Sequence, residues 1–297
     1  MKLQACIKSM RLRTLLLSLA GVVMGTFIAA TWQPLSAGTT ILLLSTTALL
    51  QILSNLSNEL GDTLHGTDTD ERQGIRYSLQ DGDMTLPQMK RLILVVVVCC
   101  AVSGLAMIWC SFGTLIGIEP LLLVLLGAAA ITAAMRYTLG KNPYGYRGWG
   151  DLFVFIFFGL VSVCGGYYIH THDLTNLLVL LSACAIGFFS IGVLNVNNIR
   201  DMKTDAANRT TVALKLGLRR ARIYQTLLIV AGWVAMAIYT ALTATHWAAW
   251  LYVLTLPLYI KHLYGVWHRE ESALDPMLPL LVISTFLLTL LAGVGML

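Results

Sequence analysis

The chain has 297 residues, of which 57% are hydrophobic and 12% charged, with a mean hydropathy of +0.75 and a formal net charge of +5. Ordinary soluble domains carry about 25% charged residues, so this composition excludes a soluble globular protein and predicts a polytopic membrane protein. Backbone groups inside lipid must be hydrogen-bonded within the protein, and the alternating pattern of a membrane β-barrel is absent, so the fold class that we expect is all-α.

The apolar stretches predict nine membrane-spanning helices. A hydrocarbon core of about 30 Å needs about 20 apolar residues per helix. The predicted spans cover residues 14–32, 38–60, 92–116, 119–138, 151–170, 174–199, 222–242, 247–264 and 276–296. In the first span, Gly21 and Gly25 have the small-xxx-small spacing that lets two helices approach closely.

The basic residues predict how these spans are oriented. All 20 Lys and Arg residues fall on one side of the nine spans, and such residues mark the cytoplasmic side. We therefore expect a multi-pass membrane protein with its N-terminus in the cytoplasm and its C-terminus on the opposite side. The positive net charge reflects this orientation, and it gives no reason to expect a nucleic-acid partner. We expect the spans to contact membrane lipid.

The inner end of the second predicted span carries an unusual density of acids. The stretch from Asn58 to Arg72 reads NELGDTLHGTDTDER and holds five carboxylates. Asn58 and Asp62 are four positions apart, which places both on one face of a helix. Ionisable groups at a membrane boundary are costly unless paired, and they usually have a function. We expect the connection over residues 61–91 to form a lid over this site, with a solvated loop as the alternative.

The loop between the fourth and fifth predicted spans combines aromatic and basic residues. It reads RYTLGKNPYGYRGWGD over residues 136–151, and its Gly, Pro and Asn residues predict irregular structure. The pattern fits an interfacial aromatic belt and contact with an anionic or aromatic substrate equally well. The residues concerned include Lys141, Tyr144, Tyr146 and Arg147.

A second polar stretch follows the sixth predicted span. Residues 195–209 read NVNNIRDMKTDAANR, with Asn197, Asp201 and Asp205 at intervals of four. This spacing puts an amide and two carboxylates on one helical face. Asp62 and Asp201 are 139 positions apart, and we interpret the two acidic faces as halves of one metal site.

The donor set favours magnesium and a diphosphate substrate. Mg²⁺ prefers oxygen ligands and typically bridges carboxylates to substrate phosphates, whereas Zn²⁺ would call for His or Cys. Metal ions and nearby Lys or Arg stabilise the charge on a departing diphosphate. The group that leaves must survive as a cation, as an allylic prenyl group can. Its hydrocarbon tail would lie in the bundle, where water is excluded.

On these motifs the sequence resembles the UbiA superfamily of intramembrane prenyltransferases, and most closely its menaquinone branch, over essentially the whole chain. The family signature is N-D-x-x-D-x-x-x-D with a second D-x-x-x-D motif. Here Glu59 replaces the usual Asp, and the third acid is displaced by two positions to Asp68. The variant N-x-x-x-D-x-x-x-G-x-D resembles the menaquinone branch, as do NPYGYRGWGD and LNVNNIRDMKTD.

This resemblance implies one transmembrane domain over residues 1–297, with a central cavity and cytoplasmic caps over about 61–91 and 200–222. It implies an Mg²⁺-dependent enzyme, with two ions, that transfers a polyprenyl group from a polyprenyl diphosphate to 1,4-dihydroxy-2-naphthoate, loses CO2 and yields a demethylmenaquinone. Asn58, Asp62, Asp68, Asn197, Asp201 and Asp205 would hold the metal, the four Asp residues being catalytic, while Arg72, Lys141, Tyr144, Tyr146, Arg147, Arg200 and Lys203 would bind substrate.

Two alternatives remain at this point. Within the family, the acceptor could be 4-hydroxybenzoate or another aromatic compound. In a different class, paired acids could carry the coupling ion of a cation-coupled transporter, although such a site favours the midplane of the bilayer. Asp62 and Asp201 both lie at one predicted boundary, facing the cytoplasm.

Overall fold

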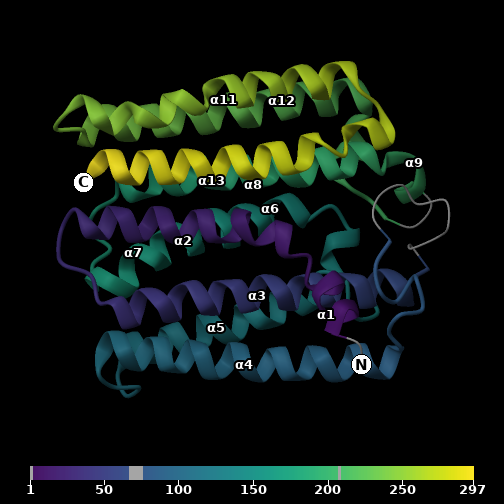
Figure 1. The fold of residues 1–297 in the computed structure, drawn as a ribbon, viewed down its shortest axis with the longest axis horizontal. Coiled ribbons are helices and arrows are strands. Elements are labelled where there is room, and N and C mark those ends of the chain that lie inside the picture. Colours follow the sequence, from purple (N-terminus) through teal and green to yellow (C-terminus); the bar gives the residue numbers. More distant parts are fainter. Residues whose placement is uncertain (1–2, 67–75, 207–208) are drawn as a thin grey trace.

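The protein is a bundle of helices that run along the long axis of the molecule (Figure 1). The computed structural model describes residues 3–66, 76–206 and 209–297. Within these ranges the regular structure is helical, apart from one isolated bridge between Arg147 and Thr210. The elements are α1 (Leu3–Met10), η1 (Leu12–Thr14), α2 (Leu15–Ala30), α3 (Ala37–Leu64), α4 (Leu86–Phe112), α5 (Ile118–Arg136), η2 (Tyr144–Tyr146), α6 (Gly150–Val154), η3 (Phe155–Val161), α7 (Ser162–Thr171), α8 (Val179–Arg200), α9 (Met202–Asp205), α10 (Val212–Leu216), α11 (Leu218–Thr243), η4 (Trp247–Thr255), α12 (Leu256–His268), η5 (Glu271–Leu274) and α13 (Met277–Met296).

The all-α, polytopic character of the chain is confirmed. In the described part of the chain, 8 helical stretches are long and apolar enough to cross a membrane. The predicted span over residues 247–264 is instead a 3₁₀ run, η4, followed by α12, with Pro257 in the first turn of that helix. Proline cannot donate a backbone hydrogen bond and fits the start of a helix, which explains the break. The count of nine spans therefore stays a prediction.

Local capping sets the ends of the helices beside the acidic stretches. Helix α3 continues to Leu64, so Asn58 and Asp62 lie on its last turns. Helix α4 begins at residue 86, earlier than the predicted start at 92, because Thr85 and Gln88 form a capping box around it. The predicted cap over about 200–222 contains α9, α10 and the start of α11. Thr211 caps α10, and Gly217 ends it with φ 74°.

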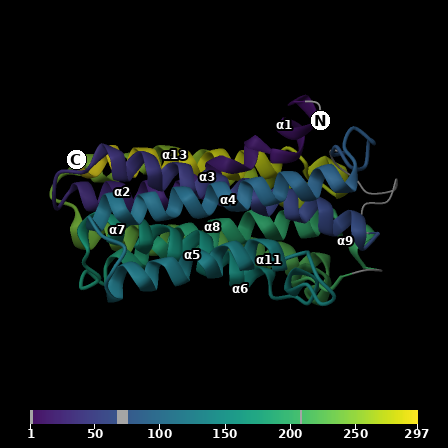
Figure 2. The same ribbon diagram turned by 90° about the horizontal axis from the view of Figure 1, so that it is seen from below.

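The two largest of the four hydrophobic cores define two groups of packed helices. One core joins residues of α2, α7, α8, α11 and α13, and a second joins residues of α1, α3 and α4. Helix α8 is the most enclosed span, with 67% of its apolar window buried, whereas only 6% of the α5 window is buried. Figures 1 and 2 place α1 and α9 at one end of the molecule and the C-terminus at the other. The two acidic segments therefore meet at a single end of the bundle.

Glycines let α2 and α7 approach closely, as the spacing of Gly21 and Gly25 predicts. A Cβ atom added to Gly25 would lie 2.2 Å from the Val163 carbonyl oxygen, and one added to Gly21 would lie 2.3 Å from the Ser162 hydroxyl oxygen. Because the obstacle at Gly25 is backbone, it cannot be relieved by a side-chain rotation. Contact between these helices thus depends on the absence of a side chain at this position.

We expect Gly25→Ala to destabilise the protein by about 1–3 kcal/mol, the usual cost of overpacking a close interface. Gly165→Ala is the matched control, because it lies in α7 of the same pair and a Cβ there would meet nothing within 4 Å. Unfolding of the purified protein in mild detergent measures both. Equal unfolding temperatures for the two variants would contradict this account of the helix contact.

Candidate active site

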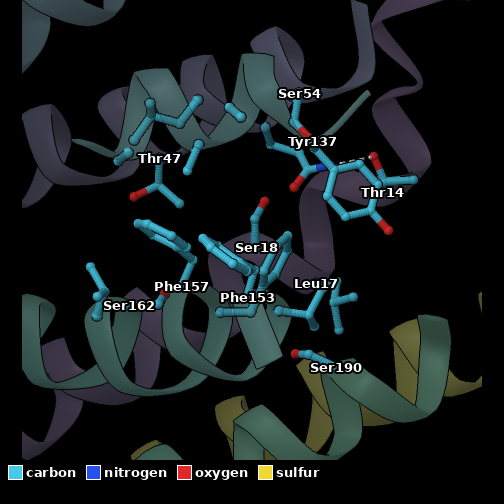
Figure 3. Close-up of a pocket in the computed structure, with 18 of the residues that line it drawn as sticks. Thr14, Leu17, Ser18, Thr47, Ser54, Tyr137, Phe153, Phe157, Ser162 and Ser190 are labelled. Atoms are coloured by element: carbon cyan, nitrogen blue, oxygen red, sulfur yellow. Dashed lines mark hydrogen bonds between the residues drawn. The ribbon is translucent and has the colours of Figure 1, made fainter. Parts of the chain in front are cut away.

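A cavity of about 630 Å³ lies between the two packed groups of helices. Its long apolar part is lined by small and branched residues of α4 and α5 and by Phe153 and Phe157. Figure 3 shows these two rings across the space from Thr47 and Ser54 of α3. Its polar part is lined by Asn58, Asp62, Asn197, Arg200 and Arg209. The cavity therefore joins a hydrocarbon-like region to a charged end.

Arg209 joins the two acidic segments. Its Nη2 atom lies 3.2 Å from Asp62 Oδ1, and its Nε atom lies 3.0 Å from Asp205 Oδ1. Tyr146 donates a hydrogen bond of 2.6 Å to the same Asp62 oxygen, and the guanidinium carbon is 4.8 Å from the centre of the Tyr146 ring. Asp62 and Asp205 are both buried, at 3% and 4% exposed. Residues 147 positions apart in the chain thus share one ionic network.

Arg200 organises the second acidic segment. It donates from Nε to Asp201 Oδ1 and from Nη2 to Asp201 Oδ2, each at 2.7 Å. The same guanidinium also donates to Asn197 Oδ1 at 2.9 Å and to Asp275 Oδ1 at 2.8 Å. The Asp201 side chain is 1% exposed and the Arg200 side chain 9%. A fork-to-fork pair of this kind is stronger than a single-contact ion pair, so Arg200 fixes the orientation of the Asp201 side chain.

Asn58 and Glu59 have different surroundings, although they are adjacent. Asn58 lines the cavity and accepts a hydrogen bond of 3.2 Å from the Thr138 hydroxyl. Glu59 is fully buried and accepts a hydrogen bond of 2.8 Å from the backbone N–H of Leu79. Glu59, which stands where the family signature usually has Asp, therefore anchors the loop that precedes α4.

The remaining predicted site residues divide into three groups. Tyr144 lines the cavity, stacks on Phe153 at 4.0 Å and donates to the Ala133 carbonyl. Burial raises the pKa of its phenol, which therefore acts as a neutral donor. Exposed side chains outside the cavity lining belong to Lys141, Arg147 and Lys203, the last paired with Glu271. Asp68 and Arg72 lie outside the described residues.

Sequence reasoning missed Arg209 as a member of the site. The signal that could have found it is its position four residues after Asp205, where helical geometry brings opposite charges together. Its contact with Asp62 has no such local signal, since it depends on how α3 packs against the segment after α8.

The oxygen donors at the polar end suit Mg²⁺. Asn58, Asp62 and Asn197 line the cavity, and amide and carboxylate oxygens are the ligands that this ion prefers. Within the described ranges, no three His, Cys, Asp or Glu side chains form a preassembled metal group. In this structure the guanidinium groups of Arg200 and Arg209 hold Asp201, Asp62 and Asp205.

Comparison with known proteins agrees with the fold and with the motifs. The model of the UbiA prenyltransferase family matches residues 18–290. The 1,4-dihydroxy-2-naphthoate octaprenyltransferase of Escherichia coli (strain K12) is 38% identical to this chain, over 98% of the chain and 94% of that protein. The protein of the same name from Haemophilus influenzae is 35% identical, over 100% and 96% respectively.

Two solved structures share the fold. The apo structure of a UbiA homolog from Aeropyrum pernix K1 has a TM-score of 0.74 at 17% identity, covering 97% of this chain and 99% of that one. A UbiA homolog from Archaeoglobus fulgidus bound to DMAPP and Mg²⁺ has a TM-score of 0.65 at 14% identity, with the same coverage. The family resemblance is confirmed by the relatives that match almost the full length: the chain belongs to the UbiA prenyltransferase family.

Proposed function

We propose that this protein transfers a polyprenyl group from an all-trans polyprenyl diphosphate to 1,4-dihydroxy-2-naphthoate, with loss of CO2 and diphosphate, in menaquinone biosynthesis. Two relatives of almost full length are named for transfer of an octaprenyl group to that acceptor. The observation that carries the proposal is the meeting of Asp62 and Asp205 at Arg209, beside a cavity with an apolar part.

The polar end would hold the diphosphate. Asn58, Asp62, Asp68, Asn197, Asp201 and Asp205 are the proposed ligands of two Mg²⁺ ions, which would neutralise charge on the departing diphosphate. A homolog of the same fold was solved with DMAPP and Mg²⁺, which supports this assignment. Arg200 and Arg209 line the cavity beside these acids, so a bound diphosphate would find two guanidinium groups that now pair with carboxylates.

The apolar part of the cavity would hold the prenyl chain. The C–O bond to diphosphate breaks and its electron pair leaves with the phosphate, so the prenyl group becomes an allylic cation. The carbon of the electron-rich naphthoate ring that carries the carboxylate attacks C1 of that cation. The bond to the carboxylate then breaks, its electron pair stays in the ring, and CO2 departs, which leaves the quinol form of a demethylmenaquinone. Phe153, Phe157 and their apolar neighbours would keep water from the cation.

The membrane arrangement is part of the proposal. The nine predicted spans, with η4 and α12 together forming the eighth, would make one domain around the cavity. The end that carries α1 and α9 also carries most of the basic residues. By the positive-inside rule this end, the N-terminus and the active site would face the bacterial cytoplasm, with the C-terminus on the far side.

The test is prenyl transfer in membranes that contain the protein and lack the host activity. We expect Mg²⁺, an all-trans polyprenyl diphosphate and carboxyl-labelled 1,4-dihydroxy-2-naphthoate to release labelled CO2 and diphosphate in equal amounts. The parallel reaction with 4-hydroxybenzoate should give no product. Prenylated hydroxybenzoate without CO2 would replace the naphthoate assignment, and ion flux without diphosphate release would favour a transporter.

A further inference from the structure

The junction between α1 and α2 places one arginine in an unusual backbone conformation at the wall of the cavity. Arg11 has φ 51° and ψ 52°, a left-handed conformation that residues other than glycine rarely adopt. Its side chain lines the cavity with those of Arg13, Thr14 and Tyr77.

The guanidinium of Arg11 packs against the ring of Tyr77. Its carbon lies 3.7 Å from the centre of the Tyr77 ring. In the part of the chain that the structure describes, its buried Nε and Nη2 atoms have no hydrogen-bond acceptor. A buried polar group without a partner is costly, so this site lacks the acceptor for which its donors are arranged. Tyr77 is itself fixed, since Arg13 Nη2 donates to its hydroxyl at 3.2 Å.

A network of amides fixes the chain that carries this guanidinium. Asn55 Nδ2 donates to Thr14 Oγ1 at 2.9 Å and to the Met10 carbonyl at 2.8 Å. Gln51 Nε2 donates to the same Thr14 hydroxyl at 3.3 Å. Residues on both sides of Arg11 are therefore tied to α3. The backbone strain at Arg11 is supported by its surroundings, as strained conformations at binding sites usually are.

This cation is distinct from the cations of the diphosphate end. Asn55 precedes Asp62 by seven residues in α3, which corresponds to about 10 Å along a helix. Arg200 and Arg209 lie with Asp201 and Asp62, whereas Arg11 lies over Tyr77. Tyr137 and Phe153 also line this cavity (Figure 3), and their rings suit a flat aromatic molecule.

We propose that Arg11 binds the carboxylate of the aromatic acceptor, an assignment that rests on the proposed function. A guanidinium and a carboxylate match as two forks with parallel N–H···O bonds, and the face of Tyr77 covers the other side of the guanidinium. Binding in this way orients the acceptor ring in the cavity. Loss of CO2 removes the negative charge, so the neutral product no longer has this ion pair and is bound less tightly than the substrate.

The experiment compares ligand binding to wild-type protein and to Arg11→Gln in detergent, with turnover measured in parallel. We expect the Kd and KM for 1,4-dihydroxy-2-naphthoate to rise about 10-fold to 100-fold, the usual effect of losing a hydrogen-bonded charge pair. The Kd and KM for polyprenyl diphosphate should change less than about threefold. Binding of 1,4-dihydroxynaphthalene, which has no carboxylate, should be equal in the two proteins.

Arg91→Gln is the matched control, because Arg91 is exposed on α4 outside the cavity lining. Should Arg11→Gln unfold, Arg11→Lys decides: weaker naphthoate binding with unchanged diphosphate binding supports the assignment. An unchanged naphthoate Kd in a folded Arg11 variant overturns it, as does a rise in the diphosphate Kd instead. If wild-type protein binds naphthoate through Arg11 but does not prenylate it, the proposed function fails while the carboxylate site stands.

Discussion

Asp62→Asn should lower the rate of prenyl transfer by at least about 100-fold, the scale on which loss of one electrostatic stabiliser of a leaving group acts. Asn has the shape of Asp and can still accept from the Tyr146 hydroxyl, which lies 2.6 Å from Asp62 Oδ1. It lacks the negative charge that would bind Mg²⁺ and that now faces Arg209. A lower rate of prenyl transfer in this variant would therefore result from the missing charge and not from a change of side-chain shape. Release of diphosphate from labelled prenyl diphosphate measures it.

A magnesium titration of the same variant separates metal binding from substrate binding. We expect half-maximal activity to require a higher Mg²⁺ concentration, because one charged ligand is missing. The control is Asp83→Asn, since Asp83 is an exposed acid on the same side of the predicted bundle, and it should behave as wild type. Full activity of Asp62→Asn at ordinary Mg²⁺ concentrations would exclude Asp62 from the metal site.

Arg200→Gln should destabilise the fold by about 3–5 kcal/mol, the usual cost of removing one partner of a buried ion pair. The Asp201 side chain is 1% exposed and receives two of the hydrogen bonds of Arg200. Without the guanidinium, that carboxylate would be buried without its counter-charge. Loss of helical circular dichroism on titration with denaturant measures the free energy of unfolding.

Two further variants define the cause of this loss. Asp275→Asn removes the charge of one partner of the same guanidinium, on a side chain that is 41% exposed, and ion pairs of that exposure contribute at most about 1 kcal/mol. Arg200→Gln combined with Asp201→Asn should recover part of the loss, because no uncompensated charge remains. If Arg200→Gln unfolds at the same denaturant concentration as wild type, this pair does not stabilise the protein.

Features that depend on short-range patterns could be predicted from the amino-acid sequence. Composition established a polytopic all-α membrane protein, because about 20 apolar residues are what a helix needs to cross a bilayer. The four-residue spacing within each acidic stretch put Asn58 with Asp62, and Asn197 with Asp201, on single helical faces. The spacing of Gly21 and Gly25 predicted a close helix contact, and backbone atoms of α7 occupy that space.

Contacts between side chains that are distant in the chain became apparent only in the folded protein. The spacing of four residues accounts for the contact of Arg209 with Asp205, but nothing near Arg209 in the chain indicates that it also contacts Asp62. Nor does the chain around Glu59 indicate that this buried acid binds the loop before α4 through Leu79. The break at the predicted eighth span and the left-handed Arg11 also appear only in the folded chain. Periodicity describes one helix at a time, whereas these contacts depend on the packing of several helices, which side-chain volumes across the whole bundle determine together.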